Sequence, residues 1–281
     1  SLECAGVGAA TLLNTLCVSA CRVIADVVQW CRREPHMMKN SLKDKLAKGQ
    51  AVLGVFVAVP SPDMVEMCGY MGFDFVLLDA EHGPMSVETA AHLIRAAECA
   101  GIVPIVNVPS HSPQSIVRYL DIGALGIQVP QVNDRDEAEA IVRAVKYHPL
   151  GARGMARPRA GHYGLVGSVQ DYMASANQET MIVASIENIE GVKHLPHILS
   201  TPGIDVFLVG PNDLSQSMGL PGQVASPLIK SAIDTIVTQV RGGGRAVGIF
   251  ASDAAAARAY IAKGAQYIIT SSTGLLARAA R

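Results

Sequence analysis

Short apolar runs recur from residue 50 to the end of the chain, separated by segments with helical spacing. The runs cover residues 51–59, 73–79, 102–108, 125–130, 181–187, 204–210, 246–251 and 265–270. Polar and apolar residues alternate little within them, which is typical of strands buried on both faces of a parallel sheet. Eight such strands joined by helices predict a (β/α)8 TIM barrel. A doubly wound open sheet is the alternative, although no GxGxxG follows the first strand.

The intervening segments carry recognisable helix ends. Ser61-Pro62 and Ser112-Pro113 each place proline at the first position of a predicted helix. Asp134, followed by Glu137 three residues later, predicts a capping box. Glycines mark where helices should stop, at Gly72, Gly101, Gly123, Gly203, Gly242 and Gly264.

Residues 148–180 interrupt this regular pattern. The interval begins "HPLGARGMARPRAGHYG", and its glycine and proline content predicts a long loop. Its candidate ligand-binding side chains are Arg153, Arg157, Arg159, His162 and Tyr163. Because the loop follows a helix, it begins on the face of a barrel opposite the usual active site. This placement favours a subunit contact or a solvated basic loop over a substrate clamp.

Residues 1–36 are predicted to form a helical extension, with the barrel domain at 37–281. The apolar stretch 5–21 is shorter than the ~20 residues of a membrane-spanning helix, and Asn14 and Thr15 interrupt it. Glu3 stands where a secretory signal would carry basic residues. The extension could present an apolar face to a partner. It could also be artefactual, because "MMKNSLKDKLAKG" at 37–49 resembles a natural protein start.

Composition narrows the class of ligand. The 281 residues are 49% hydrophobic and 17% charged, with a net charge of −1, and no basic stripe suggests nucleic-acid binding. The six cysteines form no CxxC pair, which favours free thiols in the reducing cytoplasm over a disulfide framework or a zinc site. A small-molecule site is therefore expected.

Carboxylates follow several of the predicted strands. Asp79 and Glu81 follow the second strand, Glu187 the fifth and Asp213 the sixth, and the C-terminal strand ends of a barrel meet at one mouth. Clustered carboxylates repel one another unless a cation lies between them. We therefore expect a divalent metal, Mg²⁺ or Mn²⁺ with Co²⁺ also possible, held by Glu187 and Asp213. Taken singly, Asp213 could be a helix cap, and Glu187 could pair with a loop arginine.

His82 is the candidate general base. It lies at a strand end beside Asp79 and Glu81, either of which could hold its second ring nitrogen. His92 and His111 suit capping roles better. No lysine lies within a predicted strand or at its C-terminal end, so a Schiff-base mechanism has no candidate residue.

With these residues in view, the chain resembles the class II, metal-dependent pyruvate aldolases of the hydroxy-ketoacid (HpcH/HpaI-type) family. This family includes 4-hydroxy-2-oxoheptanedioate aldolase, 2-dehydro-3-deoxyglucarate aldolase and, more distantly, macrophomate synthase. The resemblance covers about residues 40–281. It is carried by "GFDFVLLDAEHGP", "VPIVNVPSHSPQSIVRYLDIGALGIQVPQV", "YHPLGARG", "IENIEGV", "FLVGPNDLS" and "TGLLARAA".

The resemblance implies an activity and a set of roles. A 4-hydroxy-2-oxo acid would be cleaved to pyruvate, or a close analogue, and an aldehyde through a metal-stabilised enolate. Glu187 and Asp213 would bind the metal, and His82 would be the base, oriented by Asp79. Glu81 would support the water molecules bound to the metal. The substrate-binding residues would be Asn107, Ser185, Asn212, Phe56 and Phe250.

Three departures from the family pattern leave alternatives open. Asn107 replaces an arginine that would neutralise the ketoacid, Ser185 replaces a glutamine, and the C-terminal helix is short. The first departure allows weaker activity, an arginine recruited from the 153–159 loop, or another substrate. The alternatives to an active aldolase are a ketoacid-binding barrel with reduced or lost turnover and an acyl-CoA carbon–carbon lyase. Family resemblance also implies a homo-oligomer, a hexamer, in which the N-terminal extension could substitute for the incomplete C-terminal helix.

Overall fold

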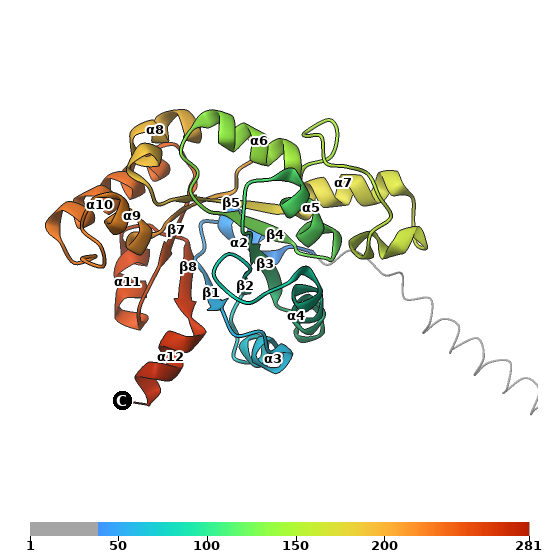
Figure 1. The fold of residues 1–281 in the computed structure, drawn as a ribbon, viewed down its shortest axis with the longest axis horizontal. Helices are drawn as coiled ribbons and strands as arrows, with labels where there is room; N and C mark the ends of the chain where they lie inside the picture. Colours follow the sequence, from blue (N-terminus) through green and yellow to red (C-terminus); the bar gives the residue numbers. More distant parts are fainter. Residues whose placement is uncertain (1–38, 281) are drawn as a thin grey trace, which may run out of the picture. The chain divides into compact units, whose positions relative to one another are not determined.

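A computed structural model describes residues 39–280, in which strands and helices alternate around a closed barrel (Figure 1). The strands are β1 (Val52–Val57), β2 (Phe75–Asp79), β3 (Val103–Asn107), β4 (Gly126–Val129), β5 (Met181–Ile186), β6 (Val206–Val209), β7 (Ala246–Phe250) and β8 (Tyr267–Ser271). Neighbouring strands are parallel, and β8 pairs with β1. The predicted (β/α)8 barrel is confirmed, and the open-sheet alternative is excluded. The predicted extension, residues 1–36, lies outside the described residues.

Helices follow the strands around the outside of the barrel (Figure 1). They are α2 (Ser41–Ala47), α3 (Pro62–Tyr70), α4 (Val87–Ala100), α5 (Pro113–Asp121), α6 (Arg135–Val145), η1 (Arg159–Gly164, a 3-10 helix), α7 (Val169–Glu179), α8 (Ile189–Leu199), α9 (Pro211–Ser217), α10 (Pro227–Gly242), α11 (Ala254–Ala262) and α12 (Ser272–Ala279). Within residues 39–280, no helix has the length and apolar content needed to cross a membrane.

The predicted helix starts are confirmed by their capping hydrogen bonds. Ser61 caps α3 and Ser112 caps α5 through their hydroxyl oxygens. Asp134 Oδ1 accepts from the backbone N–H of Glu137 at 2.8 Å. The reciprocal bond of the capping box is displaced by one residue, because Glu137 Oε2 accepts from the N–H of Asn133.

Two apolar layers stabilise the barrel, one inside the sheet and one between the sheet and the helices. Inside, the rings of Phe75 and Tyr267 stack with centroids 4.3 Å apart. Gly54 makes room for them, since a Cβ there would lie 2.2 Å from the Phe75 ring. Leu42 of α2 joins the same layer and is fully buried. The interior is therefore filled below the strand ends, as in other barrels of this kind.

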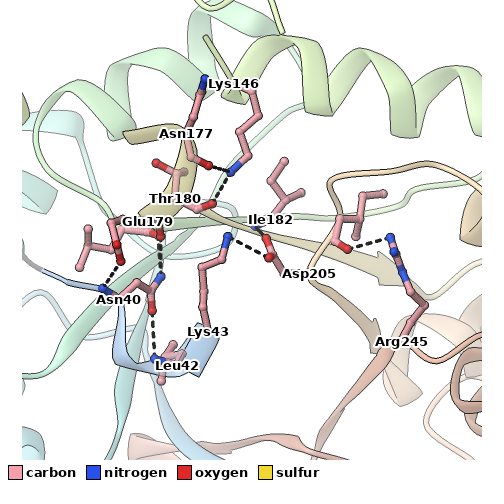
Figure 2. Close-up of polar contacts among 12 residues, drawn as sticks. Asn40, Leu42, Lys43, Lys146, Asn177, Glu179, Thr180, Ile182, Asp205 and Arg245 are labelled. Atoms are coloured by element: carbon pink, nitrogen blue, oxygen red, sulfur yellow. Dashed lines mark hydrogen bonds and ion pairs between the residues drawn. The ribbon is translucent and has the colours of Figure 1, made fainter. Parts of the chain in front are cut away.

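Polar contacts close the N-terminal face of the barrel (Figure 2). The backbone N–H of Asn40 donates to Glu179 Oε2 at 2.7 Å, and Asn40 Nδ2 donates to the Leu125 carbonyl at 3.1 Å. Lys43 Nζ lies 3.1 Å from Asp205 Oδ1. These contacts tie α2 and its N-cap to the end of α7 and to the residues just before β4 and β6, all far from it in the sequence.

The prediction of a long loop over 148–180 is wrong for part of that interval, because η1 and α7 lie within it. Ser168 caps α7 by accepting from the Asp171 N–H at 3.0 Å. The helix sequence, VQDYMASANQE, has no continuous apolar stripe, and Ala176 is the one residue of the helix that is buried. The apolar spacing by which a helix can be identified in a sequence is therefore absent from α7.

The arginines of this interval dock it against the barrel's own helices. Arg153 Nη2 donates to Asp121 Oδ1 at 2.7 Å, and its guanidinium lies 4.7 Å from the centroid of the Tyr147 ring. The Arg153 side chain is only 1% exposed. Arg159 pairs with Glu98 and donates to the Ile122 carbonyl. Arg153 is thus a buried structural residue, and the expectation of a solvated basic loop is wrong for it.

Candidate active site

The C-terminal strand ends surround a cavity of about 290 Å³. One part of its wall is apolar, formed by Phe56, Leu77, Leu208, Phe250 and Ile269. The other part is polar, formed by Glu81, His82, Asn107, Gln128, Ser185, Glu187, Asn212, Asp213 and Ser271. Every predicted site residue except Asp79 lines this cavity. The cavity therefore offers a ligand both apolar surface and a set of carboxylates and hydrogen-bonding groups.

Asp79 shapes the turn that follows β2. Its Oδ1 accepts from the backbone N–H of Glu81 at 3.2 Å and of His82 at 3.0 Å. Gly83 completes the turn, since a Cβ there would lie 2.4 Å from the Asp79 carbonyl oxygen. Asp79 is almost fully buried, and its carboxylate holds the backbone of this turn in place.

The His82 ring has a different neighbour. Its Nε2 lies 3.7 Å from Glu81 Oε1, and 71% of its side chain is exposed to the mouth of the barrel. In this structure Asp79 therefore positions the His82 backbone, while Glu81 is the carboxylate beside the ring. The sequence left open which of the two acidic residues holds the ring, and in the structure Glu81 is the nearer one.

Asn107 connects three strand ends. Its Nδ2 donates to Glu81 Oε2 at 2.9 Å, and its Oδ1 accepts from Gln128 Nε2 at 3.3 Å. The register of the sheet explains this contact, because Asp79, Asn107 and Gln128 lie side by side on β2, β3 and β4. A relay of two hydrogen bonds therefore runs from the Gln128 amide through the Asn107 amide to the Glu81 carboxylate.

Glu187 is a buried carboxylate without a basic partner in the cavity lining. Its Oε1 accepts from the backbone N–H of Gln131 at 2.8 Å. Gly210 lies against its other oxygen, since a Cβ there would be 2.3 Å from Oε2. Burial raises the pKa of the Glu187 carboxyl to about 7 against the opposing effect of this N–H, and the charges of Asp213 and Glu81 add to the rise.

Asp213 lies in the first turn of α9, at the mouth of the same cavity. The N-cap of this helix is Gly210, which has no side chain to cap it, so Asp213 does not occupy the N-cap position. Its side chain is exposed. Asn212 precedes it, with a backbone carbonyl that accepts from Ser215 Oγ at 2.6 Å.

These groups fit a hard divalent cation with few protein ligands. Glu187 and Asp213 provide oxygen donors, and no lysine or arginine lines the cavity. The described residues contain no group of three or more His, Cys, Asp or Glu side chains arranged to enclose a metal ion. Two carboxylates would leave other coordination positions for water or substrate, which suits Mg²⁺ or Mn²⁺ better than a closed structural site.

The structure does not bring the predicted loop arginines to this site. Arg153 and Arg159 are engaged with Asp121 and Glu98, and neither lines the cavity. The possibility that an arginine of the 153–159 loop replaces the charge missing at Asn107 is therefore not supported by this geometry.

Sequence reasoning missed Gln128 as a site residue. It stands within "LGIQVP", a run interpreted as an apolar strand. A lone polar side chain at an inward position of a buried strand was the available signal, because inward positions near the C-terminal strand ends face the active site of a barrel. Ser271, the last residue of β8, also lines the cavity and was not predicted as a site residue.

A barrel with carboxylates and a histidine at its C-terminal strand ends has the layout of an enzyme that acts on a small molecule. Comparison with known proteins assigns this enzyme to the aldolase and lyase class: residues 52–280 match the HpcH/HpaI aldolase/citrate lyase family, and the chain belongs to this family. The predicted resemblance is confirmed, and the chain is an aldolase-type carbon–carbon lyase.

Individual relatives agree with this assignment. The chain is 35% identical over 246 residues to 4-hydroxy-2-oxo-heptane-1,7-dioate aldolase of Escherichia coli, covering 86% of this chain and 93% of the relative. A family member from Burkholderia cenocepacia J2315 has a TM-score of 0.82 at 33% identity, covering 86% and 96%. The citrate synthase SbnG has a TM-score of 0.77 at 36% identity, covering 84% and 93%. These relatives do not favour a barrel without turnover or an acyl-CoA lyase.

Proposed function

We propose that this chain cleaves a 4-hydroxy-2-oxo acid reversibly to pyruvate, or a close analogue, and an aldehyde with the help of a divalent metal. The observation that carries the proposal is the pairing of buried Glu187 with Asp213 around a cavity whose lining contains no basic side chain other than His82. Family membership and the Escherichia coli aldolase support the reaction class.

Glu187 and Asp213 are the proposed ligands of the metal. A divalent cation bound there supplies Lewis-acid polarisation of the 2-oxo group and balances negative charge that develops on its oxygen. Glu187 is held for this task by the Gln131 N–H and by its close fit against Gly210. The raised pKa of Glu187 is the expected property of a buried carboxylate that is designed to face a cation.

His82 is the proposed base. Its exposed ring can reach a substrate that enters from the mouth of the barrel, and Glu81 lies beside the ring nitrogen to stabilise the imidazolium. In the cleavage direction the ring takes the proton of the C4 hydroxyl as the C3–C4 bond breaks, and it then returns a proton to C3, the step that exchange of pyruvate protons runs in reverse. Asp79 contributes by fixing the backbone from which the ring projects.

The remaining lining residues are proposed to position the substrate. The backbone N–H groups around Asn212 begin α9 and are free to bind a carboxylate, since a helix leaves its first N–H groups unpaired. Phe56 and Phe250 supply the apolar wall. Asn107 and Ser185 face the bound acid as neutral hydrogen-bonding groups.

Several finer properties remain predictions of this proposal. Oxygen ligation favours Mg²⁺ or Mn²⁺, with Co²⁺ as a further possibility. We expect a homo-oligomer, a hexamer by family resemblance, acting in the cytoplasm on a small 2-oxo acid and an aldehyde. These properties are separate from the assignment of the reaction.

The exchange of pyruvate methyl protons in D₂O, followed by proton NMR, tests the proposal. We expect Mg²⁺-dependent exchange that EDTA abolishes and that Glu187→Ala and Asp213→Ala each lower by at least about 100-fold, as expected when a charge-stabilising group is removed. Asp136→Ala, an exposed position on α6, is the matched control and should exchange at the rate of the unaltered protein. Exchange that survives EDTA would contradict the metal-dependent reaction.

A further inference from the structure

Two buried polar atoms in the cavity wall have no hydrogen-bond partner within residues 39–280. They are Gln128 Oε1 and Ser185 Oγ. Gln128 is 5% exposed and Ser185 is 1% exposed, and both side chains line the cavity. A buried polar atom that lacks a partner is unfavourable, so such atoms commonly mark a position that a ligand or water fills.

The relay from Glu81 fixes which atom of Gln128 is free. A carboxylate only accepts hydrogen bonds, so the Asn107 atom beside Glu81 Oε2 is the amide nitrogen. The Asn107 oxygen then faces β4 and accepts from Gln128 Nε2. Gln128 Oε1 is consequently the amide atom that has no partner among the described residues, and it can only accept.

This polarity selects the ligand group. The carboxylate and 2-oxo oxygens of a keto acid are acceptors and cannot pair with Gln128 Oε1. A hydroxyl can donate to Gln128 and at the same time accept from the Ser185 hydroxyl. Each of the two unpartnered atoms can therefore pair with an alcohol group.

The depth of these residues indicates which reactant carries the alcohol. Gln128 pairs in register with Val183, two residues before Ser185 and four before Glu187 along β5. The alcohol site thus lies deeper in the barrel than the carboxylates. Since the enolate must form before the aldehyde adds to it, the 2-oxo acid enters the cavity first, and the deep position belongs to it.

We propose that Gln128 and Ser185 form a hydroxyl-binding subsite and that the preferred 2-oxo acid carries a hydroxyl at C3. This inference rests on the proposed function and specifies its substrate class. The cleavage follows the same steps as for a 4-hydroxy-2-oxo acid. The C3–C4 bond of a 3,4-dihydroxy-2-oxo acid breaks, the C4 hydroxyl loses its proton to give the aldehyde, and C3 gains a proton to give hydroxypyruvate or a close analogue. Gln128 and Ser185 act as specificity-determining residues.

Binding of hydroxypyruvate and pyruvate in the presence of Mg²⁺, measured by isothermal titration calorimetry, tests the subsite without requiring turnover. We expect hydroxypyruvate to bind more tightly, and Gln128→Met to lower the ratio of the two affinities about tenfold, the effect of about one hydrogen bond. Ser185→Ala should lower the same ratio and provides an independent test if Gln128→Met fails to fold. Gln178→Met, exposed on α7, is the control and should leave the ratio unchanged.

Deuterium exchange at C3 with both acids separates the two possible failures. Exchange of pyruvate with an affinity ratio that neither variant changes would overturn the hydroxyl subsite and leave the proposed function standing. Selective binding of hydroxypyruvate without exchange of either acid would contradict the proposed function and support the subsite. Absence of binding by both acids would overturn both.

Discussion

At the scale of single residues, the turn after β2 shows how the chain places a base without restraining its ring. Asp79 holds the backbone N–H of His82 at 3.0 Å, whereas the ring itself lies free beside Glu81. The backbone contact sets where the ring begins, and rotation of the side chain lets it follow the reacting proton. Removal of the ring should therefore affect proton transfer more than folding.

We expect His82→Gln to lower the rate of C3 proton exchange by at least about 100-fold, because general-base catalysis contributes about this much. The variant should unfold at the same urea concentration as the unaltered protein, since the ring is largely exposed. NMR exchange and urea unfolding monitored by circular dichroism are the measurements. His92→Gln, exposed on α4, is the matched control; equal exchange in both variants would show that His82 is not the base.

The residues of the cavity also show what a single sequence could reveal. Glu187, Asp213, His82 and Asn107 stand just at or after strand ends, so the barrel prediction alone places them at one mouth. Gln128 lies inside a strand, and its role depends on the in-register contact with Asn107. Cross-strand register is set by the three-dimensional sheet, so the relay could not be predicted.

A second residue, Lys146 at the end of α6, provides a pH-dependent prediction. Its Nζ donates to the carbonyls of Asn177 at 2.8 Å and Thr180 at 2.6 Å (Figure 2). Burial lowers the pKa of Lys146 to about 8, and Lys43 and Arg153 act in the same direction, while Asp205 opposes them. A lowered pKa of a lysine in the folded state means that folding favours its neutral form.

The contribution of Lys146 to stability is therefore fully present above its unfolded pKa of 10.5 and is lost as the pH falls through about 8. We expect the free energy of unfolding, relative to Lys146→Met, to rise by about 2–3 kcal/mol between pH 8 and pH 10. Urea titrations of both proteins across this range measure the difference. A difference independent of pH would mean that the carbonyl contacts keep Lys146 charged throughout.

At the scale of elements, the strands could be predicted because they are buried on both faces. The segment between α6 and β5 was harder to predict. Seven of the eight apolar runs contain the whole observed strand, and the eighth, 265–270, ends one residue before the end of β8 at Ser271. The α7 helix was missed because it packs through few apolar side chains and depends on contacts such as the bond from Asn177 Nδ2 to the Tyr147 carbonyl. Polar docking of this kind leaves no periodic signal in the sequence.

The docking of this segment should be sensitive to Arg153. We expect Arg153→Met to lower the free energy of unfolding by about 2–4 kcal/mol, because it leaves Asp121 without its partner and removes the contact with the Tyr147 ring. Urea unfolding measures the loss. Arg157→Met, an exposed position in the same segment, should change the stability by less than about 0.5 kcal/mol. Comparable losses in the two variants would argue against specific docking through Arg153.

At the scale of the whole molecule, Asn40 lies near the start of the described residues and donates to Glu179 and Leu125 across the N-terminal face of the barrel. Leu42 then fills the end of the barrel interior. The residues from Met37 onward therefore contain the contacts that close the barrel in the described structure. This placement makes the predicted boundary between residues 1–36 and the barrel domain testable.

We expect a chain that begins at Met37 to fold, to retain the unfolding temperature of the full chain and to catalyse C3 exchange at the same rate. A chain that begins at Gln50 should lose at least about 3 kcal/mol of stability, because removing α2 exposes the interior around Leu42 and breaks the Asn40 contacts. Differential scanning calorimetry compares the three proteins. Equal loss in both shortened chains would place the boundary of the folded domain within residues 1–36, since the barrel would then require them.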